Sequence, residues 1–117
     1  MAITVYHYPQ CSTCKKALKW LDGRGIAHER VHIVERPPTK GTLKGALEAG
    51  IPLRNLFNTS GQSYREGNFK EKLPSLNQDQ ALSALHADGK LIKRPFLVAD
   101  GRYLVGFDEA AWAKALG

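Results

Sequence analysis

The spacing of hydrophobic and polar positions in the first third of the chain predicts a strand, a helix and a second strand. Residues 3–8 and 27–34 alternate in the manner of strands, while residues 14–21 carry apolar side chains at helical spacing. Gly23 and Gly25 are expected to end this helix. Two strands joined by a helical crossover should lie parallel with a right-handed connection.

The middle of the chain is predicted to be helical and more polar. Two prolines at positions 37–38 break the preceding pattern, and Thr39 is a suitable N-cap for a helix. Asn77 begins a capping-box sequence that opens another helix. Between these helices, residues 52–74 are polar and interrupted, with short helices that pack their few large apolar side chains. We therefore expect a helical insertion of approximately residues 37–90.

The last third predicts the remainder of the sheet. Residues 96–105 form a hairpin pattern around the primed-turn sequence Asp100-Gly101. Asp108 should cap a closing helix. The complete pattern predicts an α/β fold with a mixed four-stranded sheet flanked by helices, in a single domain over residues 1–117.

Composition and charge narrow the function only in part. The chain has 117 residues, 43% of them hydrophobic, and a net charge of +6. This charge favours anionic partners such as oxyanions, glutathione or acidic protein surfaces, but the basic residues are too scattered to indicate direct nucleic-acid binding. The sequence shows neither an apolar run of membrane-spanning length nor the pattern of a signal peptide. We expect a cytoplasmic monomer with no membrane association.

The candidate chemistry lies where the first strand leads into the first helix. Cys11 is placed at the helix N-terminus, where backbone N–H groups and the helix dipole stabilise a thiolate. Cys14 follows one turn later and can resolve a sulfur adduct on Cys11 as a disulfide. A zinc half-site and two ordinary buried cysteines are the alternatives. Zinc normally takes four ligands, and no second cysteine pair exists to complete a site, so redox chemistry is favoured and no metal is expected.

Three separated motifs, in residues 8–17, 57–66 and 91–96, extend this pattern. With them the sequence resembles the arsenate reductase (ArsC)/Spx/MgsR family over essentially its whole length. The resemblance implies a thioredoxin-like fold with a helical insertion. Within the family, both arsenate reductases and redox-responsive regulators occur.

The resemblance also implies roles for single residues. Cys11 matches the reactive cysteine of glutaredoxin-linked arsenate reductases, and Arg94 matches an arginine that holds the oxyanion. Pro95 matches a proline that is typically cis in thioredoxin-like folds. Arsenate reductases of this type carry two further arginines, at positions occupied here by Asn58 and Gly106. Neither residue can replace an arginine charge, so weak arsenate binding is expected.

Further residues are predicted to bind an oxyanion or a thiol substrate beside the cysteine. Arg65 and Arg54 can turn toward the pocket and partly replace the missing arginines, although a surface position is the commoner fate of a loop arginine. The predicted binding residues are Ser12, Thr13, Lys15, Asn58, Arg65 and Pro95.

The leading interpretation is a thiol-disulfide oxidoreductase that uses Cys11, Cys14 and Arg94 as its catalytic residues. No bound cofactor is required, and an external thiol, from glutathione, glutaredoxin or thioredoxin, would restore the reduced pair. The alternative is a redox-responsive regulator of the Spx/MgsR kind, because Spx-like proteins carry a CxxC disulfide switch. The resemblance then implies binding to the α subunit of RNA polymerase.

Overall fold

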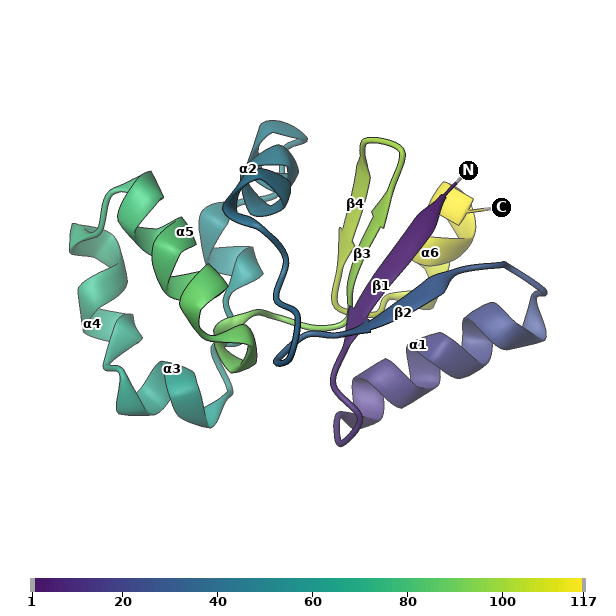
Figure 1. The fold of residues 1–117 in the computed structure, drawn as a ribbon, viewed down its shortest axis with the longest axis horizontal. Helices are drawn as coiled ribbons and strands as arrows, with labels where there is room; N and C mark the ends of the chain where they lie inside the picture. Colours follow the sequence, from purple (N-terminus) through teal and green to yellow (C-terminus); the bar gives the residue numbers. More distant parts are fainter. Residues whose placement is uncertain (1, 117) are drawn as a thin grey trace.

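The computed structural model describes residues 2–116, and a four-stranded sheet in the order β2-β1-β3-β4 lies at its centre (Figure 1). Strand β1 (Ile3–His7) pairs in parallel with β2 (Glu29–His32). Strand β3 (Phe96–Ala99) runs antiparallel to both β1 and β4 (Arg102–Val105). The predicted mixed four-stranded sheet is confirmed, although the second strand is shorter than the alternation suggested.

Two helices cover one face of the sheet. Helix α1 (Ser12–Gly23) connects β1 to β2, and α6 (Glu109–Leu116) closes the chain. Their apolar faces and the facing strand residues bury a common cluster, here called the sheet core, because each helix presents its apolar stripe inward. The sheet core consists of Ile3, Val5, Ala17, Leu21, Leu97, Ala99 and Trp112.

The insertion covers the opposite face and extends away from the sheet (Figure 1). Both predicted caps are confirmed. Oγ1 of Thr39 accepts from the Thr42 N–H at 3.1 Å, and Asn77 forms a reciprocal capping box with Gln80. The elements of the insertion are α2 (Lys40–Glu48), η1 (Leu53–Leu56), α3 (Gln62–Glu66), α4 (Phe69–Lys72), η2 (Leu73–Ser75), α5 (Gln78–Ala87) and η3 (Gly89–Leu91), where η denotes a 3₁₀ helix.

A second apolar cluster, the insertion core, joins these helices to the sheet. Close backbone approach fixes the two parts together: a Cβ at Gly45 would overlap the hydroxyl of Tyr103, and one at Gly89 would overlap the backbone carbonyl of Ile33. The buried members of the insertion core are Ile33, Leu43, Ala46, Leu56, Phe57, Tyr64, Ala81, Leu82, Leu85, Leu91, Ile92 and Phe96.

The C-terminal segment also follows its predicted pattern. Asp100 and Gly101 adopt φ values of 45° and 79°, as a primed hairpin turn requires. Asp108 caps α6 by accepting from the N–H groups of Ala110 and Ala111 at 3.1 and 3.3 Å. Trp112 of this helix is buried, with only 1% of its surface exposed. Within residues 2–116, every helix is too short or too polar to cross a membrane.

Candidate active site

Cys11 occupies the N-cap of α1, as the sequence predicted. Its backbone N–H donates to the Tyr8 carbonyl at 3.0 Å, and its own carbonyl accepts from the Lys15 N–H at 3.1 Å. These two bonds turn the chain sharply from β1 into the helix. The side chain is half-buried, so its sulfur is reachable while lying beside the first helical turn.

The environment of Cys11 favours its thiolate. Burial raises the pKa of Cys11, but this effect is outweighed by stabilisation from the backbone N–H and thiol of Cys14, the charge of Arg94 and the Thr13 N–H, so the net pKa is lowered. The sulfur makes no N-cap hydrogen bond to the helix, so the shift reflects the combined effect of these neighbouring groups. Cys11 therefore ionises more readily than an ordinary cysteine, which suits it to act as the nucleophile of the pair.

Cys14 has the opposite properties. Its side chain is only 1% exposed, and its sulfur accepts a hydrogen bond from the Tyr8 N–H at 3.5 Å. Burial, partly offset by this hydrogen bond, combines with the neighbouring Cys11 thiolate to raise the pKa of Cys14 to about 12. The pair thus consists of an accessible, acidic thiol and a shielded, protonated one.

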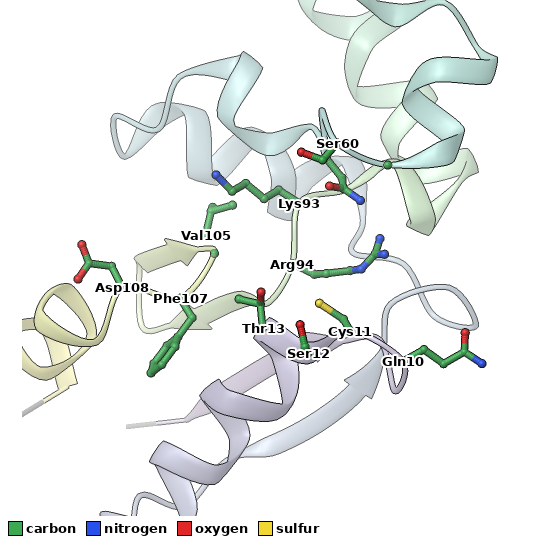
Figure 2. A pocket seen from close by; sticks show the side chains of 13 residues that line it. Gln10, Cys11, Ser12, Thr13, Ser60, Lys93, Arg94, Val105, Phe107 and Asp108 are labelled. Atoms are coloured by element: carbon green, nitrogen blue, oxygen red, sulfur yellow. The ribbon is translucent and has the colours of Figure 1, made fainter.

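Cys11 opens into a cavity of about 730 Å³, which lies between the start of α1, the insertion and the end of the hairpin (Figure 2). This volume is that of a site for a ligand of drug size, far larger than a single oxyanion. The lining residues are Gln10, Cys11, Ser12, Thr13, Asn58, Ser60, Gly61, Lys93, Arg94, Val105, Gly106, Phe107 and Asp108.

Arg94 lies between this cavity and a second, polar cavity of about 430 Å³. Its Nη1 donates to the Lys90 carbonyl at 3.0 Å, and its guanidinium lies 4.8 Å from the centre of the Tyr8 ring. Among the described residues, the buried Nε has no hydrogen-bond partner. The Arg94–Pro95 peptide bond is cis, as the resemblance implied, and Pro95 is buried and does not line the cavity.

Lys93 is a second cation on the cavity wall that the sequence analysis did not single out as a site residue. It is exposed, and in Figure 2 its side chain extends along the wall opposite Cys11. A Cβ at Gly106 would lie 3.2 Å from Cε of Lys93. The lysine therefore occupies the space beside the position at which the resemblance predicts an arginine in arsenate reductases. Its place next to Arg94 in the chain was the available signal.

The structure brings most, but not all, of the predicted residues together. Ser12, Thr13 and Asn58 line the cavity with Cys11. Arg65 does not, because Nη1 of its exposed side chain donates to the Ser60 carbonyl at 2.7 Å instead of turning inward.

Two further basic candidates also lie outside the cavity. Lys15 is exposed on α1, one position past Cys14, and is not among the lining residues. Arg54 lines a separate pocket of the insertion. Neither residue therefore supplies a replacement for the missing arginines. Across residues 2–116, no group of three histidine, cysteine, aspartate or glutamate side chains is arranged to hold a metal ion.

Comparison with known proteins gives the family. Residues 6–115 match the profile of the ArsC family. The chain belongs to the ArsC family. A solved structure of an ArsC family related protein from Bacteroides fragilis superposes with a TM-score of 0.92 at 39% identity, over 97% of each chain. The thioredoxin-like fold and the family resemblance are thereby confirmed.

Curated relatives of this ArsC-family chain carry different descriptions. The uncharacterized protein YusI of Bacillus subtilis is 47% identical, with 93% of each chain covered. An arsenate reductase of Neisseria meningitidis is 32% identical over 89% of each chain. The regulatory protein MgsR of Bacillus subtilis is 26% identical, over 96% of this chain and 88% of MgsR. Family membership therefore leaves the choice between enzyme and regulator to the site itself.

Proposed function

We propose that this ArsC-family protein is a thiol-disulfide oxidoreductase. The observation that carries the proposal is the asymmetry of the cysteine pair: the pKa of half-buried Cys11 is lowered, whereas Cys14 is buried and its pKa is about 12. A nucleophile must be ionised and accessible, while a resolving thiol must be protected until an adduct has formed. The pair meets both requirements.

The reaction consists of two thiol-disulfide exchanges. The Cys11 thiolate attacks one sulfur of a substrate disulfide, forms a mixed disulfide and releases the other half as a thiolate. Cys14 then loses its proton and attacks the Cys11 sulfur, which releases the second half of the substrate and closes the Cys11-Cys14 disulfide. The substrate gains two electrons, and two protons complete its thiols. An external thiol, from glutathione, glutaredoxin or thioredoxin, reduces the protein disulfide in a compartment such as the cytoplasm.

The two steps are ordered by the electrostatics of the pair. Part of the rise in the pKa of Cys14 comes from the charge of Cys11 and their mutual hydrogen bond. Both disappear once Cys11 enters a mixed disulfide, whereas the Tyr8 N–H and the Arg94 charge remain to stabilise a Cys14 thiolate. The pKa of Cys14 therefore falls when its attack is needed.

The cavity supports a disulfide substrate better than arsenate. Its volume of about 730 Å³ accommodates a peptide-sized thiol. Lys93 and Arg94 provide two cations, but neither position 58 nor position 106 carries an arginine. A charge-assisted hydrogen bond contributes about 1.5 to 3 kcal/mol. The loss of two arginines would weaken oxyanion stabilisation at least about a hundredfold, and one flexible, exposed lysine would restore only part of it.

The test is reductant-coupled turnover with three competing substrates: arsenate, a glutathione mixed disulfide and a protein disulfide. Glutaredoxin- and thioredoxin-linked reduction should be assayed in parallel. We expect turnover of at least one disulfide that is abolished in Cys11→Ser, with a kcat/KM for arsenate below about 10⁴ M⁻¹s⁻¹, the lower end of ordinary enzymes. A higher value for arsenate would make arsenate the natural substrate. Failure to reduce any disulfide would remove the proposal.

A redox-responsive regulator is the second candidate, because the similarity to MgsR spans 96% of this chain and the same buried Cys14 can close a disulfide switch. Such a role requires stoichiometric binding to a partner, without turnover. Pull-down of purified RNA polymerase α subunit by oxidised and reduced protein separates the candidates. Oxidation-dependent binding, together with no disulfide turnover, would favour the regulator.

A further inference from the structure

Apart from the two cavities that Arg94 lines, a groove of about 510 Å³ lies beside the Cys11 cavity, between α1 and α6. Its floor is aromatic: the rings of Trp20 and Phe107 meet edge to face with centres 6.1 Å apart, and both pack against buried Trp112. Trp20 and Phe107 are only half-buried, so the structure leaves an apolar surface open on this side.

The rim of this groove is basic. Three cations, Lys16, Lys19 and Arg24, stand against the single carboxylate of Glu109. Among residues 2–116, the side-chain ion pairs are Arg30–Asp22 and Lys40–Asp79, and neither includes these three cations. The guanidinium of Arg24 lies 4.7 Å from the centre of the Trp20 ring. An aromatic floor with an unneutralised basic rim matches a partner segment that combines an apolar side chain with carboxylates.

The groove adjoins the candidate active site. Phe107 lines both cavities, and Figure 2 shows it beside the pocket with its ring turned away from the pocket interior. A chain segment that presents a sulfur to Cys11 can therefore continue past Phe107 onto Trp20. A small disulfide would occupy only the first cavity.

We propose that this groove, formed by Trp20 and Phe107 with the rim Lys16, Lys19 and Arg24, binds an acidic segment of a partner protein whose disulfide reaches Cys11. An apolar side chain of the partner packs on the two rings, and its carboxylates face the rim. The inference rests on the proposed oxidoreductase function for the chemistry, but binding to the groove can be measured without it.

The binding test uses fluorescein-labelled peptides in which serine replaces the reactive cysteine, so that no exchange occurs. One peptide carries a leucine and three glutamates after the serine, and a second carries three lysines in place of the glutamates. Fluorescence anisotropy is recorded with the reduced full chain, its K16E/K19E variant and a K44E/K72E control. The control has the same net charge, but its exposed lysines lie in the insertion.

We expect the acidic peptide to bind the wild type and the control alike and to lose at least about tenfold in affinity in K16E/K19E. The basic peptide should bind more weakly than the acidic peptide to the wild type. Equal losses in both double variants would overturn the proposal, because net charge alone would then explain binding. It would also fail if the acidic peptide did not bind, or if a labelled single-stranded oligonucleotide bound more tightly and depended on the same two lysines.

Turnover of hydroxyethyl disulfide, which is small and uncharged, tests the chemistry separately. It should proceed at the same rate in the wild type and both double variants, since neither pair of lysines lines the Cys11 cavity. If the wild type does not reduce this disulfide, the proposed oxidoreductase function is refuted. The peptide measurements would still test whether the groove binds an acidic segment. If turnover is normal but K16E/K19E does not change peptide binding, only the proposed role of the groove is refuted.

Discussion

A limiting alkylating agent should modify Cys11 almost exclusively in the reduced protein. Iodoacetamide reacts with thiolates, and the structure separates the two cysteines both in ionisation and in access. The perturbation is Cys11→Ser, compared with the wild type at pH 8. It removes the preferred nucleophile and, at the same time, the Cys11 charge, which adds to the effect of burial in raising the pKa of Cys14.

The size of the preference follows from the two pKa values. With a pKa of about 12, Cys14 is a thiolate in about one molecule in 10⁴ at pH 8. Cys11, whose pKa lies below its ordinary value of 9.0, is ionised in about a tenth of molecules or more. The more basic thiolate is intrinsically more nucleophilic, which offsets roughly 20- to 30-fold of this difference. A preference of at least about thirtyfold remains, and the burial of Cys14 increases it.

Peptide mass spectrometry after timed alkylation measures both rates in one sample. Preferential modification of Cys11 is expected in the wild type. In Cys11→Ser, Cys14 should react faster than it does in the wild type, because its pKa falls once the neighbouring thiolate is gone. Comparable rates at the two wild-type cysteines would refute the assignment of nucleophile and resolving thiol.

Three other outcomes follow from the same contacts. Mild oxidation should give a monomer with an internal Cys11-Cys14 disulfide, and Cys14→Ser should trap mixed disulfides on Cys11; a mainly intermolecular dimer of the wild type on non-reducing gels would contradict this. Because the Arg94 charge favours the Cys11 thiolate, Arg94→Ala should raise the pKa seen in the pH dependence of alkylation, and an unchanged profile would exclude that role. Gly89→Ala should lower the free energy of unfolding by about 1 to 3 kcal/mol, whereas Gly23→Ala, with nothing within 4 Å of its Cβ, should not lower it in urea unfolding.

Local signals in the sequence predicted much of the fold and the reactive end of the site. Thr39 and Asn77 form their caps with backbone groups three residues away, and Asp100-Gly101 needs only its own backbone angles. The position of Cys11 likewise depends on a strand followed directly by a helix. Each of these features is decided within one short segment, so each can be recognised in sequence.

The opposite wall of the site depends on contacts between distant segments. The place of Lys93 next to Arg94 was a signal, but its position on the cavity wall depends on the space that Gly106, distant in sequence, leaves beside it. Arg65 was expected to turn inward as one of two options, but a nearby loop carbonyl at Ser60 satisfies its guanidinium. Trp112 looks amphipathic in sequence, yet its Nε1 donates at 3.1 Å to the buried Gly106 carbonyl, which allows the whole ring to be covered.

Because the apolar interior is divided into a sheet core and an insertion core, the insertion can be exchanged between family members in chimeric proteins. The helix that carries Cys11 packs in the sheet core, whereas Asn58 and Gly61, on the other side of the cavity, lie among residues of the insertion core. The segment from α2 to η3 can therefore be exchanged with that of another family member, while Cys11 keeps its own packing and Arg94 stays in place. Such a graft would transplant the substrate-facing wall and leave the thiol chemistry in place, provided the close contact at Gly89 is kept.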